Sequence, residues 1–575
     1  MLYNDRVYAA IGGTSDISRE EMITMSASSK KKLRKEANAA AMTEKQLQEQ
    51  KESKKLRLYT GLFAAAIAVM IVVVIVSRVI GSGIIPRNTT ALTVGGTEVS
   101  AAELNHYYID SVNSFMDQAG EYVALYGLDT TKPLDEQYYS EADELTWADY
   151  FLDQATGTAQ NMYAIYNEAK DEGFKLSEEG EASIDAAVEN MEMYATLYGF
   201  PSLEKYISTV YGEGCNEDTF RHYAEVQMIA QEYAVAKNDS LVYDDAAIRA
   251  EDEKNPANYS AFTFNYYYVA ANKFYEGGTT NEDGTTTYSD EEMDAGRAAA
   301  KDVADTLATY TTIEELDAAV GALAINAQST TTVKTTRQED VQYANVTTAI
   351  REWVTSSDRK AGDMTVIANE YTTHDHADGE ECTGENDEKS VAGYYVVLFE
   401  SMNENKTNLV NVRHILVSFE GGTYDSTTGT TTYSDEEKAK AKKTAEEILA
   451  AFTTGENTED AFAALATEKS TDTGSKENGG LYEDVYPGQM VTKFNDWCFD
   501  SARKTGDTGI VETEYGYHVM YFVGTSETTY RELMIESTLR NSDLSAWETS
   551  LIENATLSVK NTKYVNTGLV PSGNN

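Results

Sequence analysis

The sequence predicts an α+β protein of several domains that follow a single N-terminal transmembrane helix. Three observations support this prediction: a long uncharged run near the N-terminus, a stretch of helical patterns behind it, and an ordered internal repeat in the second half of the chain. With 575 residues, the chain is also longer than one hydrophobic core usually supports. We therefore interpret the chain as a succession of domains.

The charge of the chain is strongly acidic and unevenly distributed. There are 46 Lys and Arg against 95 Asp and Glu, which gives a formal net charge of −49. Residues 1–57 hold 12 basic and 8 acidic residues, so the rest of the chain holds 34 and 87. Nucleic-acid binding needs a basic face to neutralise phosphates, and the long acidic part offers none. We therefore exclude a nucleic-acid partner.

The uncharged run Leu58–Val76 is long enough to cross a bilayer core as a helix. Three basic residues lie just before it, and the positive-inside rule then places the N-terminal stub in the cytoplasm and the acidic body outside the cell membrane. We expect a basic cytoplasmic stub at 1–57 and a single-pass anchor at 58–80. A cleaved signal peptide is the alternative, but the run is longer than a typical signal-peptide core.

Helical patterns dominate the chain from 88 to 255, and the runs Asp149–Ala169 and Glu178–Leu197 are the clearest of them. Ser100 and Glu103 have the spacing of a capping box at the start of a helix. We expect a helical domain over 88–255. Its many Tyr and Met side chains are best explained as core, although such side chains also suit a surface that adapts to unfolded chains.

An internal repeat is the most informative feature of the second half. Nine residues that begin at Gly284 recur identically from Gly429, and each copy is followed by an alanine-rich helical run. Trp353 then matches Trp497, and the match resumes further on after an insertion in the first copy. Such an ordered set predicts two copies of one domain with the same strand order. The expected copies are residues 262–402 and residues 408–525.

The second copy has a readable order of elements. Ser434 and Glu437 form a capping-box pattern at the start of its first helix. Strands and helices in this order predict a small α+β domain with helices packed on an antiparallel sheet. The expected elements are a strand at Val412–Phe419, helices at Ser434–Phe452 and Glu459–Glu468, and strands at Gly509–Val511 and Tyr517–Val523.

Four short blocks in this copy resemble, in order, the motifs of the parvulin family of PpiC-type peptidyl-prolyl isomerases. They are Arg413–Val417, Gly479–Leu481, Gly488–Phe494 and Gly516–Val519. The wider layout resembles the PrsA/SurA-type foldases, in which a helical chaperone region, parvulin modules and a C-terminal return segment occur together. The resemblance implies that residues 526–575 pack on the helical domain.

The resemblance implies an isomerase and chaperone that assists the folding of secreted or surface proteins outside the cytoplasmic membrane. Its partners would be unfolded or partly folded polypeptides with X–Pro bonds, and no cofactor is implied. Rotation about the X–Pro amide meets a barrier of about 20 kcal/mol, and a dry, apolar pocket favours its less polar, twisted transition state. The alternative is a holdase chaperone in which the parvulin domains are vestigial.

The same resemblance implies the residues of the site. His414 and His518 would form a pair that shares a hydrogen-bond network with Thr513, and Asp472 would face the substrate carbonyl. A structural role for the two histidines is an equally supported interpretation. The prolyl ring would be held by Met490, Phe494 and Leu481. Since Met490 and Phe494 are four residues apart, we expect them on one face of a helical turn and partly exposed.

The first copy lacks the residues of this site. Tyr395 replaces His518, and we expect Tyr267 or Tyr268 in the place of His414. These replacements predict an inactive domain that serves as a spacer or as a surface for client proteins.

One cluster in the first copy has the residue types of a metal site. His374, His376 and Cys382 form an H-x-H-x5-C pattern inside the insertion Thr372–Lys389. No fourth ligand is evident, and the segment is polar and acidic. We therefore favour a solvated loop and expect no metal.

Overall fold

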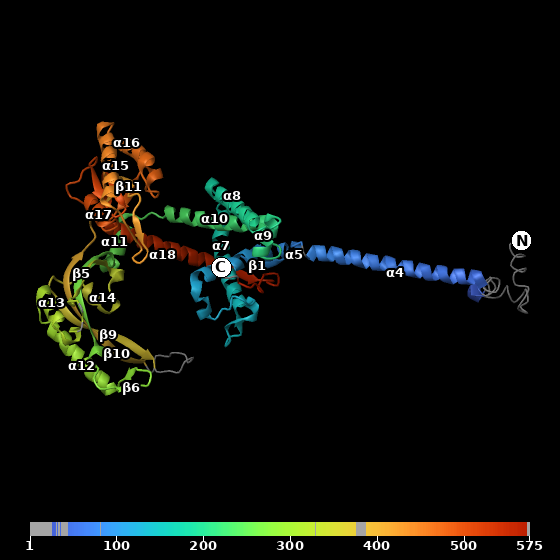
Figure 1. Cartoon of the computed structure of the whole chain (residues 1–575), viewed down its shortest axis with the longest axis horizontal. Helices are drawn as coiled ribbons and strands as arrows, with labels where there is room; N and C mark the ends of the chain where they lie inside the picture. The colour runs from blue at the N-terminus through green and yellow to red at the C-terminus, as the bar shows by residue number, and fades with distance from the viewer. Residues whose placement is uncertain are drawn as a thin grey trace, which may run out of the picture. The chain divides into compact units, whose positions relative to one another are not determined.

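The computed structural model of the chain describes residues 26–29, 31–32, 35, 44–80, 82–327, 329, 331–374 and 387–571. The chain divides into two compact units: unit 1 is Met1–Lys237 with Trp547–Asn575, and unit 2 is Asn238–Ala546. Helices and antiparallel sheets make up the described part of both, so the α+β class is confirmed. Figure 1 shows these elements along the chain and labels many of them.

Helix α4, Glu44–Ile80, includes the run that the sequence predicts to be a membrane anchor. Its described apolar side chains are exposed, and Phe63 and Val69 are 68% and 62% accessible. None of the helices in the described ranges is both long and apolar enough to cross a bilayer. The side chains of residues 58, 59 and 75–80 lie outside the described set.

Unit 1 is built mainly from helices. The helical patterns around residues 149–169 and 178–197 are confirmed as α7 and α8. The helices of the unit after α4 are α5 (Ile84–Arg87), α6 (Ala101–Ala119), α7 (Trp147–Asp171), α8 (Glu178–Leu197), α9 (Leu203–Val210) and α10 (Glu217–Ser240), whose last residues enter unit 2. A small hairpin is formed by β3 (Tyr138–Ser140) and β4 (Leu145–Thr146).

The capping pattern at the start of α6 is only half formed. Ser100 Oγ accepts a hydrogen bond from the Glu103 backbone N–H at 3.1 Å, as an N-cap should. The Glu103 carboxylate does not return to the cap, because it is buried and accepts a hydrogen bond from the Tyr163 hydroxyl. The predicted capping box is therefore wrong on its glutamate side.

The end of the chain completes the core of unit 1. Strand β17 (Leu557–Val559) pairs with β1 (Thr90–Val94), which also pairs with β2 (Thr97–Ser100). Ala555 and Val565 are buried in the same cluster as Tyr107 and Phe151. Residues 526–546 belong instead to unit 2, and helix α18 (Tyr530–Asn554) passes from one unit into the other.

Unit 2 contains two four-stranded antiparallel sheets with the same strand order. The first has the order β8-β5-β10-β9 and the second has the order β14-β11-β16-β15, so strands at the same place in each copy occupy the same place in each sheet. This agreement supports the internal repeat. The strands are β5 (Ala261–Ala270), β8 (Thr336–Gln342), β9 (Met364–His374) and β10 (Asp387–Asn403), then β11 (Asn408–Ser418), β14 (Leu481–Val485), β15 (Thr508–Glu512) and β16 (Gly516–Thr529).

Identical turn sequences produce identical helix starts in the two copies. Ser289 with Glu292 and Ser434 with Glu437 each form a complete capping box. The helices are α11 (Asp245–Lys254), α12 (Asp290–Leu307), α13 (Ile313–Gly321) and α14 (Thr348–Val354), then α15 (Asp435–Thr454), α16 (Glu459–Lys469) and α17 (Thr492–Cys498). Two short hairpins precede α12 and α15: β6 (Thr279–Thr280) with β7 (Thr286–Thr287), and β12 (Thr423–Asp425) with β13 (Thr430–Thr432).

The strand register corrects one expectation about the first copy. Tyr395 lies opposite Tyr268, whereas its counterpart His518 lies opposite Leu416. The counterpart of Leu416 is therefore Tyr268, and the residue in the place of His414 is Tyr266. The prediction of Tyr267 or Tyr268 is wrong.

The cause of this shift is a short helical turn. A 3-10 turn at Ala271–Phe274 follows β5, whereas only Phe419 separates β11 from Glu420. As a result, 148 residues separate Tyr266 from His414, but 144 separate Glu276 from Glu420. An offset taken from the turn sequence therefore does not apply to the strand.

Arg531 connects several segments of unit 2. Its side chain lies in the first turn of α18 and is 7% exposed. Its Nε donates to the Asp252 carboxylate at 3.0 Å, and its two Nη atoms donate to the carbonyls of Tyr259 and Glu404 at 3.0 and 3.3 Å and of Pro256 at 2.8 Å. One guanidinium thus satisfies polar groups of α11, of the turn before β5 and of the connection between the sheets.

We expect Arg531→Ala to lower the free energy of unfolding of unit 2 by about 3 kcal/mol, because it leaves an ion pair half removed and buried carbonyls without a donor. Urea unfolding followed by circular dichroism measures this change. The control is Arg249→Ala, an exposed arginine of α11, which should cost less than about 0.5 kcal/mol. Equal stability of the two variants would contradict the connecting role of Arg531.

Candidate functional site

Two neighbouring strands place the paired histidines on one face of the second sheet. His414 of β11 lies opposite Met520 of β16, and His518 is two residues before Met520. Side chains two apart on a strand share a face, so the two imidazoles are diagonal neighbours. Their Nδ1 atoms are 3.0 Å apart, and their ring centroids are 5.1 Å apart with an interplanar angle of 24°. The side chains are 3% and 6% exposed.

A line of hydrogen bonds runs through this pair. At one end, His414 Nε2 lies 3.0 Å from Asp472 Oδ2. At the other end, His518 Nε2 lies 2.9 Å from Thr513 Oγ1. The structure thus brings together all four residues that the sequence predicts as catalytic. We refer to Asp472, His414, His518 and Thr513 as the histidine chain.

Asp472 is the charged end of the histidine chain. Burial raises the pKa of this carboxyl, but hydrogen bonds from the Ser475 hydroxyl, the Gly474 N–H and His414 outweigh burial and lower the pKa to about 2. The Tyr482 hydroxyl also donates to Asp472 Oδ2, at 3.1 Å. Asp472 is therefore ionised at neutral pH, and its carboxylate oxygens act only as acceptors.

The two histidines are the neutral part of the histidine chain. Burial lowers the pKa of His414, although the nearby Asp472 works against this shift. Burial, and then the charge that His414 would carry, lower the pKa of His518 to about 3. Both imidazoles are therefore uncharged near neutral pH.

These protonation states leave one arrangement of hydrogens. Because Asp472 can only accept, His414 Nε2 carries the proton, and the Nδ1 atom of the neutral ring is an acceptor. His518 must then donate from Nδ1, so its Nε2 accepts from the Thr513 hydroxyl. Each donor in the chain has one acceptor, and the direction is set by the charge on Asp472.

The apolar side of the site differs from the sequence prediction. Phe494 is only 3% exposed, and its ring edge contacts both imidazoles at centroid distances of 5.5 and 5.3 Å. Met490 is half-buried and precedes α17, which begins at Thr492, so the expected helical turn shared with Phe494 is wrong. The prediction of partial exposure is confirmed for Met490. It is wrong for Phe494, because Phe494 packs in the core beneath the sheet.

The third predicted pocket residue, Leu481, is the first residue of β14 and lies opposite Arg413. It is partly exposed, at the edge of the sheet on which His414 lies. Its side chain shares the face of Arg413, whereas His414 and Tyr482 face the other side of the sheet. This register does not support the predicted contact of Leu481 with the prolyl ring.

The sequence prediction missed two residues of the site. Ser475 is buried and lies 3.1 Å from His414 Nε2 through its hydroxyl, and Tyr482 stacks on the His414 ring at 5.2 Å. A signal existed for Ser475, which follows Asp472 by three residues, a spacing typical of local side-chain capping. Tyr482 comes from a separate strand, and no local pattern indicates it.

No metal centre is evident in the described ranges, where His, Cys, Asp and Glu side chains form no group of three or more with metal-binding geometry. His376 and Cys382, together with the side chain of His374, lie outside the described residues. The expectation of a solvated loop there stays a prediction.

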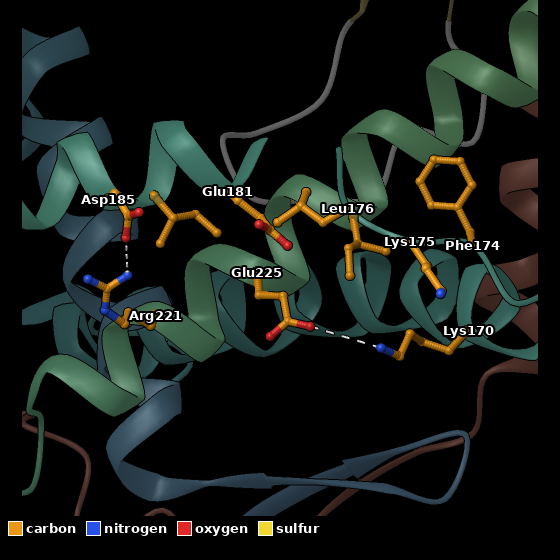
Figure 2. A pocket seen from close by; sticks show the side chains of 10 residues that line it. Lys170, Phe174, Lys175, Leu176, Glu181, Asp185, Arg221 and Glu225 are labelled. Carbon is orange, nitrogen blue, oxygen red and sulfur yellow. Dashed lines mark hydrogen bonds and ion pairs between the residues drawn. The ribbon is translucent and has the colours of Figure 1, made fainter. Parts of the chain in front are cut away.

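Unit 1 contains a separate pocket of about 530 Å³. Figure 2 shows its lining, in which Lys170 Nζ lies 3.9 Å from Glu225 and Arg221 lies 2.7 Å from Asp185. Apolar side chains such as Leu176 lie between these charged residues. A hollow with apolar and charged parts suits a polypeptide segment better than a purely apolar ligand.

Comparison with known proteins identifies the domain that carries the histidine chain. Residues 394–524 match the family model of the PPIC-type PPIase domain. The foldase protein PrsA 1 of Listeria innocua is 39% identical over 84 residues, which are 15% of this chain and 27% of that protein. The foldase protein PrsA of Caldanaerobacter subterraneus is 39% identical over 103 residues, which are 17% and 32% of the two chains. The chain thus matches about a quarter to a third of the length of these relatives.

Similar structures have also been solved. PrsA from Bacillus subtilis is 25% identical, with 28% of this chain and 55% of that chain covered and a TM-score of 0.18. The PPIase domain of TbPar42 is 24% identical, with 20% and 98% covered and a TM-score of 0.16. The family match over residues 394–524 shows that the histidine chain lies in a parvulin-type, or PPIC-type, peptidyl-prolyl isomerase domain. The similarity to the PrsA foldases covers 84 to 103 residues of this chain in the two relatives named above.

The depressed histidine pKa values predict acid sensitivity. An unfolded histidine takes up a proton near pH 6.5, whereas folded His518 does so near pH 3. The contribution of neutral His518 to the free energy of unfolding is therefore complete above pH 6.5 and is lost as the pH falls toward 3. We expect this residue to contribute a slope of about 1.4 kcal/mol per pH unit between pH 6 and 4.

Urea unfolding of the full chain between pH 7 and pH 4 measures this slope. The comparison is His518→Asn, which should have a smaller slope because one site of proton uptake on unfolding is gone. Identical slopes in the two proteins would show that His518 titrates normally in the folded state.

Proposed function

We propose that the chain is a peptidyl-prolyl cis/trans isomerase and chaperone that assists the folding of secreted or surface proteins outside the cytoplasmic membrane. The observation that carries this proposal is the complete histidine chain inside a domain that matches the PPIC-type family. Its partners would be unfolded or partly folded polypeptides with X–Pro bonds. Because the matched relatives are covered only in part, activity and clients are inferred for this chain.

The proposed mechanism needs no covalent step. Rotation about the X–Pro amide abolishes amide resonance, so the twisted transition state is less polar than the planar ground state. Half-buried Met490 would hold the prolyl ring, and Phe494 would support it from the core. An apolar site that excludes water stabilises the less polar state more than the ground state.

Neutral histidines fit this mechanism, because a positive charge at the site would favour the polar, planar amide. Asp472 would also fix the direction of the hydrogen bonds in the histidine chain. Its carboxylate already accepts hydrogen bonds from His414, Ser475, Tyr482 and the Gly474 N–H. Its side chain is 20% exposed, which leaves room for the proposed contact with the substrate carbonyl.

The first copy has no equivalent of this chemistry. Tyr266 and Tyr395 occupy the places of His414 and His518, and their rings contact each other at 5.8 Å. We propose that this domain is catalytically inactive and acts as a spacer or as a client-binding surface. The pocket of Figure 2 is a further candidate for client contact in unit 1.

Attachment to the membrane is the remaining part of the proposal. The uncharged run Leu58–Val76 and the basic residues before it support a single-pass anchor with residues 88–575 outside the cytoplasm. The exposed apolar side chains of α4 are consistent with contact with lipid.

A non-catalytic holdase is the second candidate. It is favoured by the burial of Phe494 and by the complete pairing of the histidine chain, since both features would also serve a purely structural core. An isomerisation assay on a proline peptide separates the candidates. Turnover by the full chain supports the isomerase, and its absence from a folded protein supports the holdase.

We expect Met490→Ala to lower kcat/KM for a proline peptide at least tenfold, because it removes half-buried apolar surface that would contact the prolyl ring. The cost in stability should stay below about 2 kcal/mol, whereas Phe494→Ala should cost about 3–5 kcal/mol as a core truncation. The control is Met402→Ala, an exposed methionine of β10. Wild-type turnover of Met490→Ala would place the proline pocket elsewhere.

The proposed topology predicts protection of one part of the chain. Protease added to intact cells that lack an outer membrane should digest residues 88–575 and leave residues 1–57 intact. Immunoblots against tags at the two ends measure the two parts. Protection of both ends, with digestion restored by detergent, would overturn the proposed orientation.

A further inference from the structure

A smaller hollow in unit 1 lies between α6, α7 and α10 and shares no residue with the pocket of Figure 2. Its volume is about 270 Å³. Hydroxyl and amide side chains such as Ser114 and Gln118 are exposed at its rim. Its wall is aromatic, with the side chains of Tyr107, Phe115, Tyr150, Phe151 and Tyr223.

Asp110 is the one charged residue of this lining. One of its oxygens accepts a hydrogen bond from the Tyr223 hydroxyl. In the part of the chain that the structure describes, Asp110 forms no ion pair, and its partial burial raises the pKa of the carboxyl. A carboxylate that has lost water without gaining a counter-charge is destabilising, so a cation at this place would be favourable.

A second polar group of the wall also lacks a partner. The Tyr107 hydroxyl has no hydrogen bond in the structure, and the side chain is 1% exposed. Its ring packs edge-on against Tyr223, the residue that donates to Asp110, at a centroid distance of 4.7 Å. Because this hydroxyl is buried, the features that suit a ligand with positive N–H donors are the Asp110 carboxylate and the aromatic rings of the same lining.

We propose that this hollow binds the arginine or lysine side chain of an extended polypeptide. Aromatic faces attract cations, and a carboxylate behind them supplies the opposite charge. A planar guanidinium can both stack on a ring and donate to a carboxylate, so arginine should bind more tightly than lysine. The volume is below the roughly 300 Å³ at which small-molecule sites begin, and it suits one side chain.

This role is distinct from prolyl isomerisation. The hollow recognises charge and not proline, and its residues belong to unit 1, whereas the histidine chain belongs to unit 2. The net charge of −49 would draw basic segments of a client toward the protein, and the hollow would hold one side chain at a defined place.

The test uses the full-length protein and two fluorescent, proline-free peptides that differ only at one residue. One peptide carries arginine, and the other carries citrulline, its neutral isostere. Fluorescence anisotropy should show at least tenfold tighter binding of the arginine peptide. Free arginine should compete much more weakly than the peptide, and equal competition would overturn the assignment to a polypeptide side chain.

Asp110→Asn should remove the preference for arginine and leave citrulline binding and isomerase turnover unchanged. The matched control is Asp171→Asn, which removes the same charge from the exposed end of α7 outside the hollow. If Asp110→Asn fails to fold, Ser114→Arg decides, because an arginine at the exposed rim should fill the hollow and block the peptide. Retained arginine preference in either folded variant would overturn the proposal.

Discussion

The buried line of hydrogen bonds from Asp472 through the two histidines to Thr513 is the constraint on which the site depends. Burial keeps both imidazoles neutral, and a neutral imidazole can carry its proton on either of its two ring nitrogens. The ionised carboxylate at one end removes this freedom, because it can only accept. The proton positions of both rings therefore follow from the charge on Asp472. Hydrogen bonds from the Ser475 and Tyr482 hydroxyls stabilise this carboxylate.

The first copy shows that the strand order of the sheet does not depend on the histidine chain. Its sheet has the same strand order, although Tyr266 and Tyr395 stand where the second copy has histidines. Apolar packing and matching capping boxes are therefore sufficient for the topology. The histidine chain adds a polar network that must be fully paired when it is buried.

In unit 1, segments that are far apart in the sequence depend on each other through packing. Strand β17 completes the sheet that β1 and β2 begin, and Ala555 is buried with residues that precede it by more than four hundred positions. Within unit 2, Arg531 gathers the carbonyls of segments that would otherwise be buried without donors. Contacts between residues far apart in the sequence therefore determine where each unit begins and ends. The local helical pattern does not.

The sequence by itself determined the features that depend on neighbouring residues: the α+β class, helices such as α7, α8 and α15, and the repeat. The four residues of the histidine chain were predicted from the resemblance to the parvulin family. Tertiary structure decided which side chains are buried and how strands align. The turn Ala271–Phe274 moved the register to Tyr266, and packing beneath the sheet buried Phe494. Tyr482 joined the site, and Tyr107 came beside Tyr223, from separate elements. Register and burial depend on residues distant in sequence, so no local pattern carries them.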